Sequence, residues 1–283
     1  MTPQDLVAKA GVLGSLPESW RQLDQVCGKP TVTTDMIAEV VATDAGLTTR
    51  ILRLANSPMF GLPGRVEAID RAVSLMGTRQ VRDLALAACV IDRFKDIPET
   101  LVSMRSFWCH SIGCALLARA IAAKRREANV ERFFVSGLLH DVGALLMCQV
   151  VPDMTAKALA KVGQGTPVVM AERSVFDFDH SDVGKALLEA WGLPQSLSIP
   201  VGRHHSPSTG VAYAVESAVI HVASTVTDLL AIGAGAEGRS GPLDLQAWGQ
   251  TGIQPATLAE IVGDLDASLE PIMEVFFPGN KST

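Results

Sequence analysis

The sequence predicts an all-α protein, and three observations support that prediction. Nearly every segment long enough to classify repeats its apolar residues with the period of a helix, and none shows the alternation typical of a strand. Candidate capping residues precede several of these segments, and glycine or proline follows them. With 283 residues, 48% of them hydrophobic, the chain is long enough to bury a substantial core.

Short amphipathic helices are expected in the N-terminal third, over residues 35–42, 47–55, 66–76 and 79–94. Thr33 and Thr34 are capping candidates for the first of them. The second should end at Asn56-Ser57-Pro58, because proline has no N–H and disfavours helical angles in the residue before it. The third should end at Gly77, which suits a left-handed cap.

The remaining helices are expected over residues 101–124, 130–150, 154–162, 168–176, 182–191, 195–205, 211–232 and 255–275. Residues 130–150 are apolar on nearly all sides, which predicts a central buried helix. The glycine-rich stretch 233–241 is typical of a flexible linker. We therefore predict an N-terminal helical part at 1–98, a helical core at 99–232 and a C-terminal extension at 233–283.

Charge and apolar patterning restrict the partners. The net charge of -6 argues against direct binding of nucleic acid, since such proteins usually present a basic face. Residues 1–14 show no cationic segment followed by an apolar stretch, and we expect no apolar run of the length needed to cross a bilayer. The sequence therefore predicts a cytoplasmic protein without a membrane partner.

The cysteines are five in number and lie in apolar periodic stretches. An odd number in that setting predicts reduced, buried thiols rather than a disulfide framework. Metal ligation by Cys109 and Cys114 is the less favoured alternative, because a five-residue spacing places them on different faces of a helix.

Five of the six histidines occur in an order that could close a metal site: His110, His140, His180, His204 and His205, with Asp141 directly after His140. Adjacent helical residues point about 100° apart, so His140 and Asp141 could serve one metal, or the carboxylate could bridge two. Mixed imidazole and carboxylate ligands favour Fe, Mn, Zn or Ni over Ca or Mg. A two-metal centre would normally activate water against a phosphate ester.

Each histidine taken singly has a purely structural alternative. A lone histidine on an apolar helix is more often a hydrogen-bonded core residue than a metal ligand, and we interpret His221 as packing or as support for a ligand. Taken as a set, the five histidines favour a metal site more than any one of them does, because the His-His pair and the His-Asp pair fall in the same part of the chain.

Several short stretches together carry a family resemblance: Leu16-Pro17, residues 44–47, Arg53-Leu-Ala-Asn-Ser57 with Phe60-Gly61, residues 72–77, Phe107-Trp-Cys-His110, residues 137–143, residues 180–184, residues 191–194 and His204-His205. Over about residues 14–228 the chain resembles the HDOD proteins, a signalling branch of the HD phosphohydrolase superfamily. The Leu-Ala-Asn-Ser element indicates this branch rather than a generic HD enzyme.

The resemblance implies an HD-type helical bundle with an N-terminal helical subdomain, serving as a regulatory module without shown catalysis. The related HD-GYP cyclic-di-GMP phosphodiesterases place metal ligands at positions resembling all six residues of the array. Three departures argue against hydrolysis. Ala144 replaces a common lysine, Ser224 occupies the expected closing aspartate position with Asp228 one turn too far along, and residues 206–210 contain no Gly-Tyr-Pro element.

We therefore expect a non-catalytic HDOD-type signalling module whose pocket is a candidate site for one or two transition-metal ions. The first alternative is a metal-dependent phosphohydrolase acting on a nucleotide or cyclic dinucleotide, with Lys185 or Arg203 supplying phosphate-binding charge. The second is a metal-free protein-interaction scaffold. A signalling protein is the expected partner, and Phe276-Phe277 is a candidate surface for a homo-oligomer, or else part of the chain's own packing.

Overall fold

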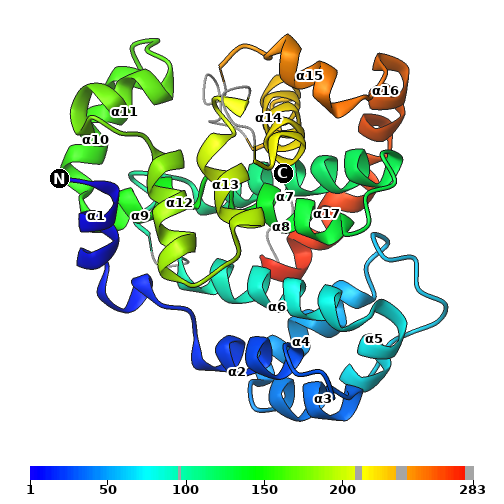
Figure 1. The fold of residues 1–283 in the computed structure, drawn as a ribbon. Coiled ribbons are helices and arrows are strands. Elements are labelled where there is room, and N and C mark those ends of the chain that lie inside the picture. Colours follow the sequence, from blue (N-terminus) through cyan, green and yellow to red (C-terminus); the bar gives the residue numbers. More distant parts are fainter. Residues whose placement is uncertain (95–96, 208–211, 234–240, 278–283) are drawn as a thin grey trace. The chain divides into compact units, whose positions relative to one another are not determined.

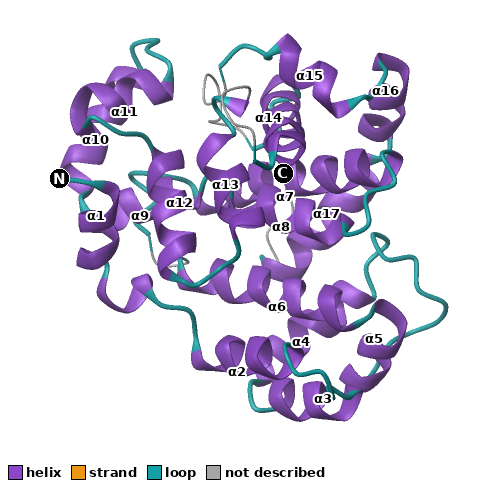
Figure 2. Ribbon diagram, viewed as in Figure 1, coloured by secondary structure: helices purple, strands orange, loops and turns teal. Residues whose placement is uncertain are grey.

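The computed structural model describes residues 1–94, 97–207, 212–233 and 241–277, and within them every regular element is a helix (Figures 1 and 2). The all-α prediction is confirmed. The chain divides into two compact units, a first of Met1–Ser15 and Phe94–Leu265 and a second of Leu16–Arg93 and Asp266–Thr283. The three predicted parts are each continuous in sequence. Each observed unit instead combines two separate segments, with the N-terminal segment in the first unit and the C-terminal segment in the second. Residues 234–240 of the predicted linker lie outside the described residues.

The second unit contains α2 (Glu18–Cys27), α3 (Thr34–Ala42), α4 (Ala45–Ala55), α5 (Ile69–Met76), α6 (Thr78–Arg93) and, from its second residue on, α17 (Leu265–Phe276). Thr33 caps α3 by accepting from the Met36 N–H, and Asp44 caps α4 by accepting from the Leu47 N–H. As predicted, α4 ends before Asn56 and α5 before Gly77. These caps fix where the apolar faces begin, and those faces form the core of the unit.

The first unit contains α1 (Pro3–Lys9), the 3₁₀ helix η1 (Gly11–Gly14), α7 (Met104–Lys124), α8 (Val130–Leu139), α9 (Val142–Val150), α10 (Pro152–Val162), α11 (Val168–Phe176), α12 (His180–Ala190), α13 (Gln195–Arg203), α14 (Ala214–Leu229), α15 (Leu245–Thr251) and α16 (Pro255–Gly263). Helix α7 packs against both α8 and α14. The side chains of Phe107, Trp108, Phe133 and Phe134 are fully buried. These large apolar groups make α7 and α8 the centre of the unit.

Two predicted helices are each divided, and three α-helices and the 3₁₀ helix η1 were not predicted. Residues 130–150 form α8 and α9 with His140 and Asp141 between them, because Asp141 has φ −101° and ψ 5°, outside the helical range. Residues 255–275 form α16 and α17, which meet at Asp264. The sequence reading omitted α1, α2 and α15, which are short and begin close to proline or aspartate caps.

The expectation that no apolar run is long enough to cross a membrane is wrong by length and composition. Met104–Lys124 and Val130–Val150 both meet those two criteria, although His140 and Asp141 interrupt the second. The structure buries 72% and 83% of their apolar windows among other helices. Burial of that extent is what core helices show.

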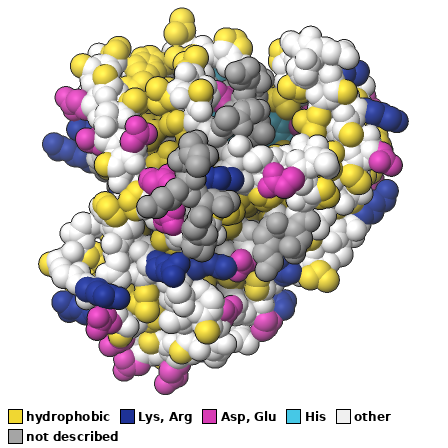
Figure 3. Space-filling model, turned by 180° about the vertical axis from the view of Figure 1, so that it is seen from behind, with side chains coloured by type: hydrophobic (Ala, Val, Ile, Leu, Met, Phe, Trp, Pro, Cys, Tyr) yellow, Lys and Arg dark blue, Asp and Glu magenta, His cyan; other side chains and the backbone are white. Residues whose placement is uncertain are grey.

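None of the five cysteines forms a disulfide bond with another; Cys89, Cys114 and Cys148 are buried, whereas Cys27 and Cys109 are partly exposed. Burial raises the pKa of Cys27 to about 11 and that of Cys89 to about 12, so both thiols are protonated at neutral pH. On the described surface drawn in Figure 3, Lys and Arg side chains are interspersed with Asp and Glu.

Candidate metal centre

The structure brings the six predicted ligands together inside the first unit. They form two overlapping groups, His110, His140 and Asp141 in one, and Asp141, His180, His204 and His205 in the other. Within each group the atoms able to bind a metal lie within 4.8 Å of one another. All except His205 are buried. Neither group contains Cys109 or Cys114.

Asp141 is shared by both groups. Its Oδ2 lies 3.2 Å from Nε2 of His140 and 3.8 Å from Nε2 of His110. Its Oδ1 lies 3.2 Å from Nε2 of His180 and 3.4 Å from Nε2 of His204. Each carboxylate oxygen therefore serves a different set of rings, as a carboxylate bridging two ions would.

Helix ends orient two of the rings. His140 directly follows α8 and donates from Nδ1 to the Gly137 carbonyl at 2.7 Å. His204 directly follows α13 and donates from Nδ1 to the Val201 carbonyl, also at 2.7 Å. The last carbonyls of a helix have no partner within it, so each histidine supplies a missing donor. We infer the tautomer from these bonds: Nε2 of each ring is left to face Asp141.

The Glu172 carboxylate supports the ring of His180, and His221 supports the backbone at His204. Glu172 on α11 accepts from Nδ1 of His180 at 2.7 Å and from the His180 backbone N–H at 2.9 Å. His221 on α14 donates from Nδ1 to the His204 carbonyl at 2.7 Å and accepts from the Asp244 N–H. The interpretation of His221 as a supporting residue agrees with these bonds. Glu172 was not predicted; its sequence signal is an acidic residue in an otherwise largely apolar helix.

Asp228, which the sequence spacing placed too far along to replace the closing aspartate, is in neither ligand group but lies against His110. Helix α14 packs along α7, and the Oδ1 atom of Asp228 reaches within 3.3 Å of Nδ1 of His110. The Asp228 side chain is only 10% exposed. It stands behind the ring, on the side opposite the atom that faces His140, where its negative charge would polarise the imidazole of His110.

Two glycines permit the close approach of the helices that carry the rings. A Cβ atom on Gly137 would lie 2.7 Å from the Ala115 Cα, so α8 can approach α7 only with glycine there. A Cβ atom on Gly143 would lie 2.0 Å from the His180 carbonyl oxygen and 2.5 Å from the Gly184 nitrogen. Gly143 therefore fixes the distance between Asp141 and His180.

Cations fit the centre of the cluster. With Nδ1 protonated, the Nε2 lone pairs of His140, His180 and His204 all point toward a carboxylate, an arrangement of acceptors that is unfavourable unless a positive charge lies between them. Nε2 of His204 is buried, and beyond its 3.4 Å approach to Asp141 it has no hydrogen-bond partner among the described residues. The rings also approach each other, with 3.3 Å between the Nε2 atoms of His110 and His140 and 2.8 Å between those of His180 and His205. Five imidazoles around one carboxylate are a donor set suited to Fe, Mn, Zn or Ni.

Without a metal, protons would supply the positive charge. Burial lowers the pKa of His140, but the adjacent Asp141 outweighs it and raises that pKa well above its ordinary value. The pKa of His180 is raised in the same way, by Glu172 and Asp141 acting against burial. Burial lowers the pKa of His204 and, more strongly, that of His205, helped by the neighbouring rings. Burial raises the pKa of Asp141, but its imidazole partners bring it well below the ordinary range.

We expect Glu172→Gln to weaken metal binding about 10- to 100-fold, which is typical for loss of a carboxylate that orients a ligating histidine. Glutamine keeps an acceptor for Nδ1 but removes the charge that polarises the ring of His180. Competition with a chromophoric chelator would measure the change. Glu189→Gln is the matched control, since Glu189 is half-exposed and its ion pair among the described residues is with Lys185, at 3.8 Å. Equal affinity in both variants would contradict the role given to Glu172.

A small cavity of about 60 Å³ adjoins the cluster. It is lined by Asp141, Glu172 and His180 and by mostly apolar side chains, including Ala144. The two predicted phosphate-binding residues do not line it. Lys185 lies over Gly202 and pairs with Glu189, and Arg203 is half-buried. Among the described residues, neither one makes a hydrogen bond or ion pair with the cluster.

This helical bundle and its centred His-Asp pair define an HD-related domain. The HDOD domain model matches residues 13–207, and the chain belongs to the HDOD family.

Solved structures share the fold. A "Putative phosphohydrolase" from Shewanella amazonensis SB2B has a TM-score of 0.78 at 24% identity, covering 96% of this chain and 97% of that one. An "HDOD domain protein with unknown function" from Geobacter sulfurreducens has a TM-score of 0.74 at 25% identity, covering 93% and 92%. A "Putative signal transduction protein" from Marinobacter aquaeolei VT8 has a TM-score of 0.71 at 20% identity, covering 92% and 59%.

Among curated proteins, an "Uncharacterized protein" from Treponema pallidum (strain Nichols) is 24% identical over 193 residues, or 68% of this chain. The chain spans 37% of that relative's own length.

Proposed function

We propose that this protein is a regulatory module whose buried His-Asp cluster holds one or two transition-metal ions and does not hydrolyse phosphodiesters. The observation that carries the proposal is that all six candidate ligands converge, while the described cavity beside Asp141 and His180 is small. The cavity beside Asp141 and His180 has about 60 Å³, whereas pockets for drug-sized ligands span roughly 300–1,000 Å³. A cyclic dinucleotide does not fit that space.

Charge also favours binding over turnover. Phosphoryl transfer needs cations placed against the phosphate oxygens. The cavity lining offers none, because Ala144 lies where a lysine would supply one. Metal ions bound here would supply Lewis acidity and positive charge. The chain's own contribution is to fix the rings through Gly137, Val201 and Glu172, and to exclude water from Asp141.

Signalling requires that the occupied cluster favour one arrangement of the protein over another, since a ligand with equal affinity for both shifts nothing. The turn at His140 and Asp141 joins α8 to α9 and is where occupancy would act first. We propose a separate signalling protein, in the cytoplasm, as the partner that senses the difference.

Metal-dependent phosphohydrolysis is the second candidate, and Asp228 favours it. Its contact with His110 supplies an acidic residue that the sequence spacing had placed out of reach. In that case a nucleotide or cyclic dinucleotide would reach the metals only after the walls of the cavity open, with Lys185 or Arg203 drawn toward the phosphate.

Elemental analysis of untagged protein purified without chelator, followed by assays with cyclic-di-GMP and a simple phosphodiester, tests the proposal. We expect iron, manganese, zinc or nickel at one to two equivalents, lost in His140→Ala, and no turnover above that variant. Stoichiometric metal with turnover above His140→Ala would establish the hydrolase instead. Protein free of metal, with no uptake when metal is added, would refute both and favour the metal-free scaffold.

A further inference from the structure

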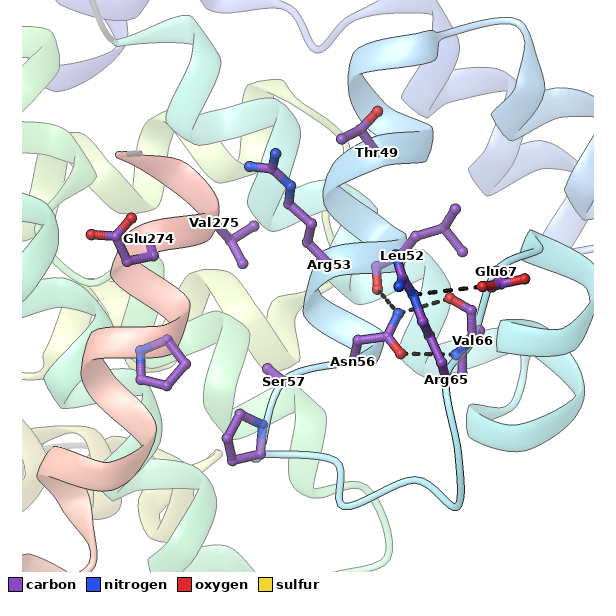
Figure 4. A pocket seen from close by; sticks show the side chains of 12 residues that line it. Thr49, Leu52, Arg53, Asn56, Ser57, Arg65, Val66, Glu67, Glu274 and Val275 are labelled. Carbon is purple, nitrogen blue, oxygen red and sulfur yellow. Dashed lines mark hydrogen bonds and ion pairs between the residues drawn. The ribbon is translucent and has the colours of Figure 1, made fainter. Parts of the chain in front are cut away.

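A groove of about 870 Å³ lies in the second unit, which holds none of the histidines. Its walls are the C-terminal half of α4, the loop over residues 57–67 and the face of α17 that carries Pro271, Glu274 and Val275 (Figure 4). Its volume falls within the range of pockets that bind small organic molecules. The Arg53-Leu-Ala-Asn-Ser57 element, which singled out the family branch, supplies Arg53, Asn56 and Ser57 to its lining.

Asn56 holds the loop wall in place. Its side-chain amide donates to the Val66 carbonyl and accepts from the Val66 N–H, both at 2.8 Å, and it also donates to the Leu52 carbonyl at 2.7 Å. The two hydrogen bonds from the Asn56 side chain to the Val66 backbone join the two ends of the loop. The groove is therefore a built feature rather than a gap beside a loose loop.

Arg53 is the exposed cation of the groove that has no ion pair among the described residues. Figure 4 shows its side chain reaching from α4 toward α17, with the Glu274 carboxylate directed away from it. Arg65 and Glu67 on the loop pair with each other, 3.6 Å apart. Within the described part of the chain, Arg53 makes no hydrogen bond or ion pair. A guanidinium in this state can bind a carboxylate or phosphate through two parallel hydrogen bonds.

Ser57 is a second, independent sign of a ligand. The residue is only 6% exposed, and its Oγ has no hydrogen-bond partner among the described residues. Leaving a buried hydroxyl unsatisfied is costly, and native proteins do so rarely. The Oγ atom itself has almost no exposed surface, so a bound molecule would reach it through a rotation of the Ser57 side chain, and a hydrogen bond made there would remove that cost.

We propose that this groove binds a small organic anion, with its carboxylate or phosphate on Arg53 and its body against the apolar lining of Leu52, Pro271 and Val275. The neighbouring hydroxyl of Ser57 would receive or supply one further hydrogen bond. The site does not depend on the metal centre and goes beyond the function proposed above.

Calorimetric titration of the full chain with adenosine 5′-monophosphate, benzoate and uncharged adenosine tests the site. We expect at least one of the two anions to bind and adenosine to bind about tenfold more weakly or worse, the factor that corresponds to one charge-assisted hydrogen bond. Binding of the nucleotide alone identifies a phosphate ligand, and binding of benzoate alone identifies a carboxylate. Failure of both anions to bind overturns the proposal.

Matched variants locate the binding. Arg53→Gln should weaken binding of the anion at least about tenfold, whereas Arg71→Gln, an exposed arginine on α5 outside the groove, should leave it unchanged. Ser57→Ala should weaken binding without lowering the thermal midpoint, because the hydroxyl has no described protein partner to lose. Chelator should have no effect, which separates this site from the metal centre. Wild-type affinity in Arg53→Gln would refute the assignment.

Discussion

Replacing Gly143 with alanine is expected to destabilise the protein by roughly 3 kcal/mol or more, which lowers the thermal midpoint by about 5 °C or more. The added Cβ would stand 2.0 Å from the His180 carbonyl oxygen, so α9 and α12 must move apart. That movement separates Asp141 from His180, and bound metal should fall together with stability. Thermal unfolding and elemental analysis of the same samples would show both losses.

Gly249→Ala is the matched control for this glycine. Gly249 lies inside α15 on the exposed surface, and a Cβ atom there would meet nothing within 4 Å. Alanine should be neutral or stabilising at such a helical position. A Gly143→Ala protein as stable as Gly249→Ala would show that the two helices do not need their close approach.

Asp141→Asn is expected to abolish metal binding, since it removes the negative charge from the residue that both groups share. Wild-type protein should gain about 2.7 kcal/mol of stability when free metal stands at 100 times its Kd, and the variant should gain none. Thermal unfolding with and without added metal would measure the difference. Asp153→Asn, at an exposed position on α10, should behave like wild type.

The same substitution should show a defined pH dependence in metal-free protein. The raised pKa values of His140 and His180 stabilise the native state below their ordinary value of 6.5, and this stabilisation is lost as pH rises through the raised values. The neutral amide of the Asp141→Asn variant cannot supply that stabilisation. The stability gap between wild type and variant should therefore be wider at about pH 6 than at about pH 9. A gap that widens with pH would contradict this account of the cluster.

Local sequence patterns predicted many of the helices, because the hydrogen bonds of helices and of their caps join residues only a few positions apart. Apolar periodicity located α3, α4 and α5, and Pro58 and Gly77 marked where two of them end. The six candidate ligands were found because adjacent His-His and His-Asp pairs are uncommon enough to draw attention. The break at His140 was missed because residues 130–150 are apolar on nearly all sides, and such a pattern gives no sign of a turn.

What escaped prediction depends on contacts between distant segments. Asp228 reaches His110 only because α14 packs on α7, and one-dimensional spacing made it look misplaced. Glu172 is an ordinary acidic residue until α11 brings it against His180. The groove is formed by α4 and α17, which lie at opposite ends of the chain.

The backbone, rather than any ion, sets how the rings of His140 and His204 are turned. An arriving cation therefore meets side chains that have already lost their rotational freedom, and little conformational entropy remains to be lost there. This differs from a zinc finger, where the metal must organise its own ligands and its departure unfolds the chain. Here the two helix ends would hold these rings in place when no metal is bound, so loss of a metal would not by itself unfold the chain.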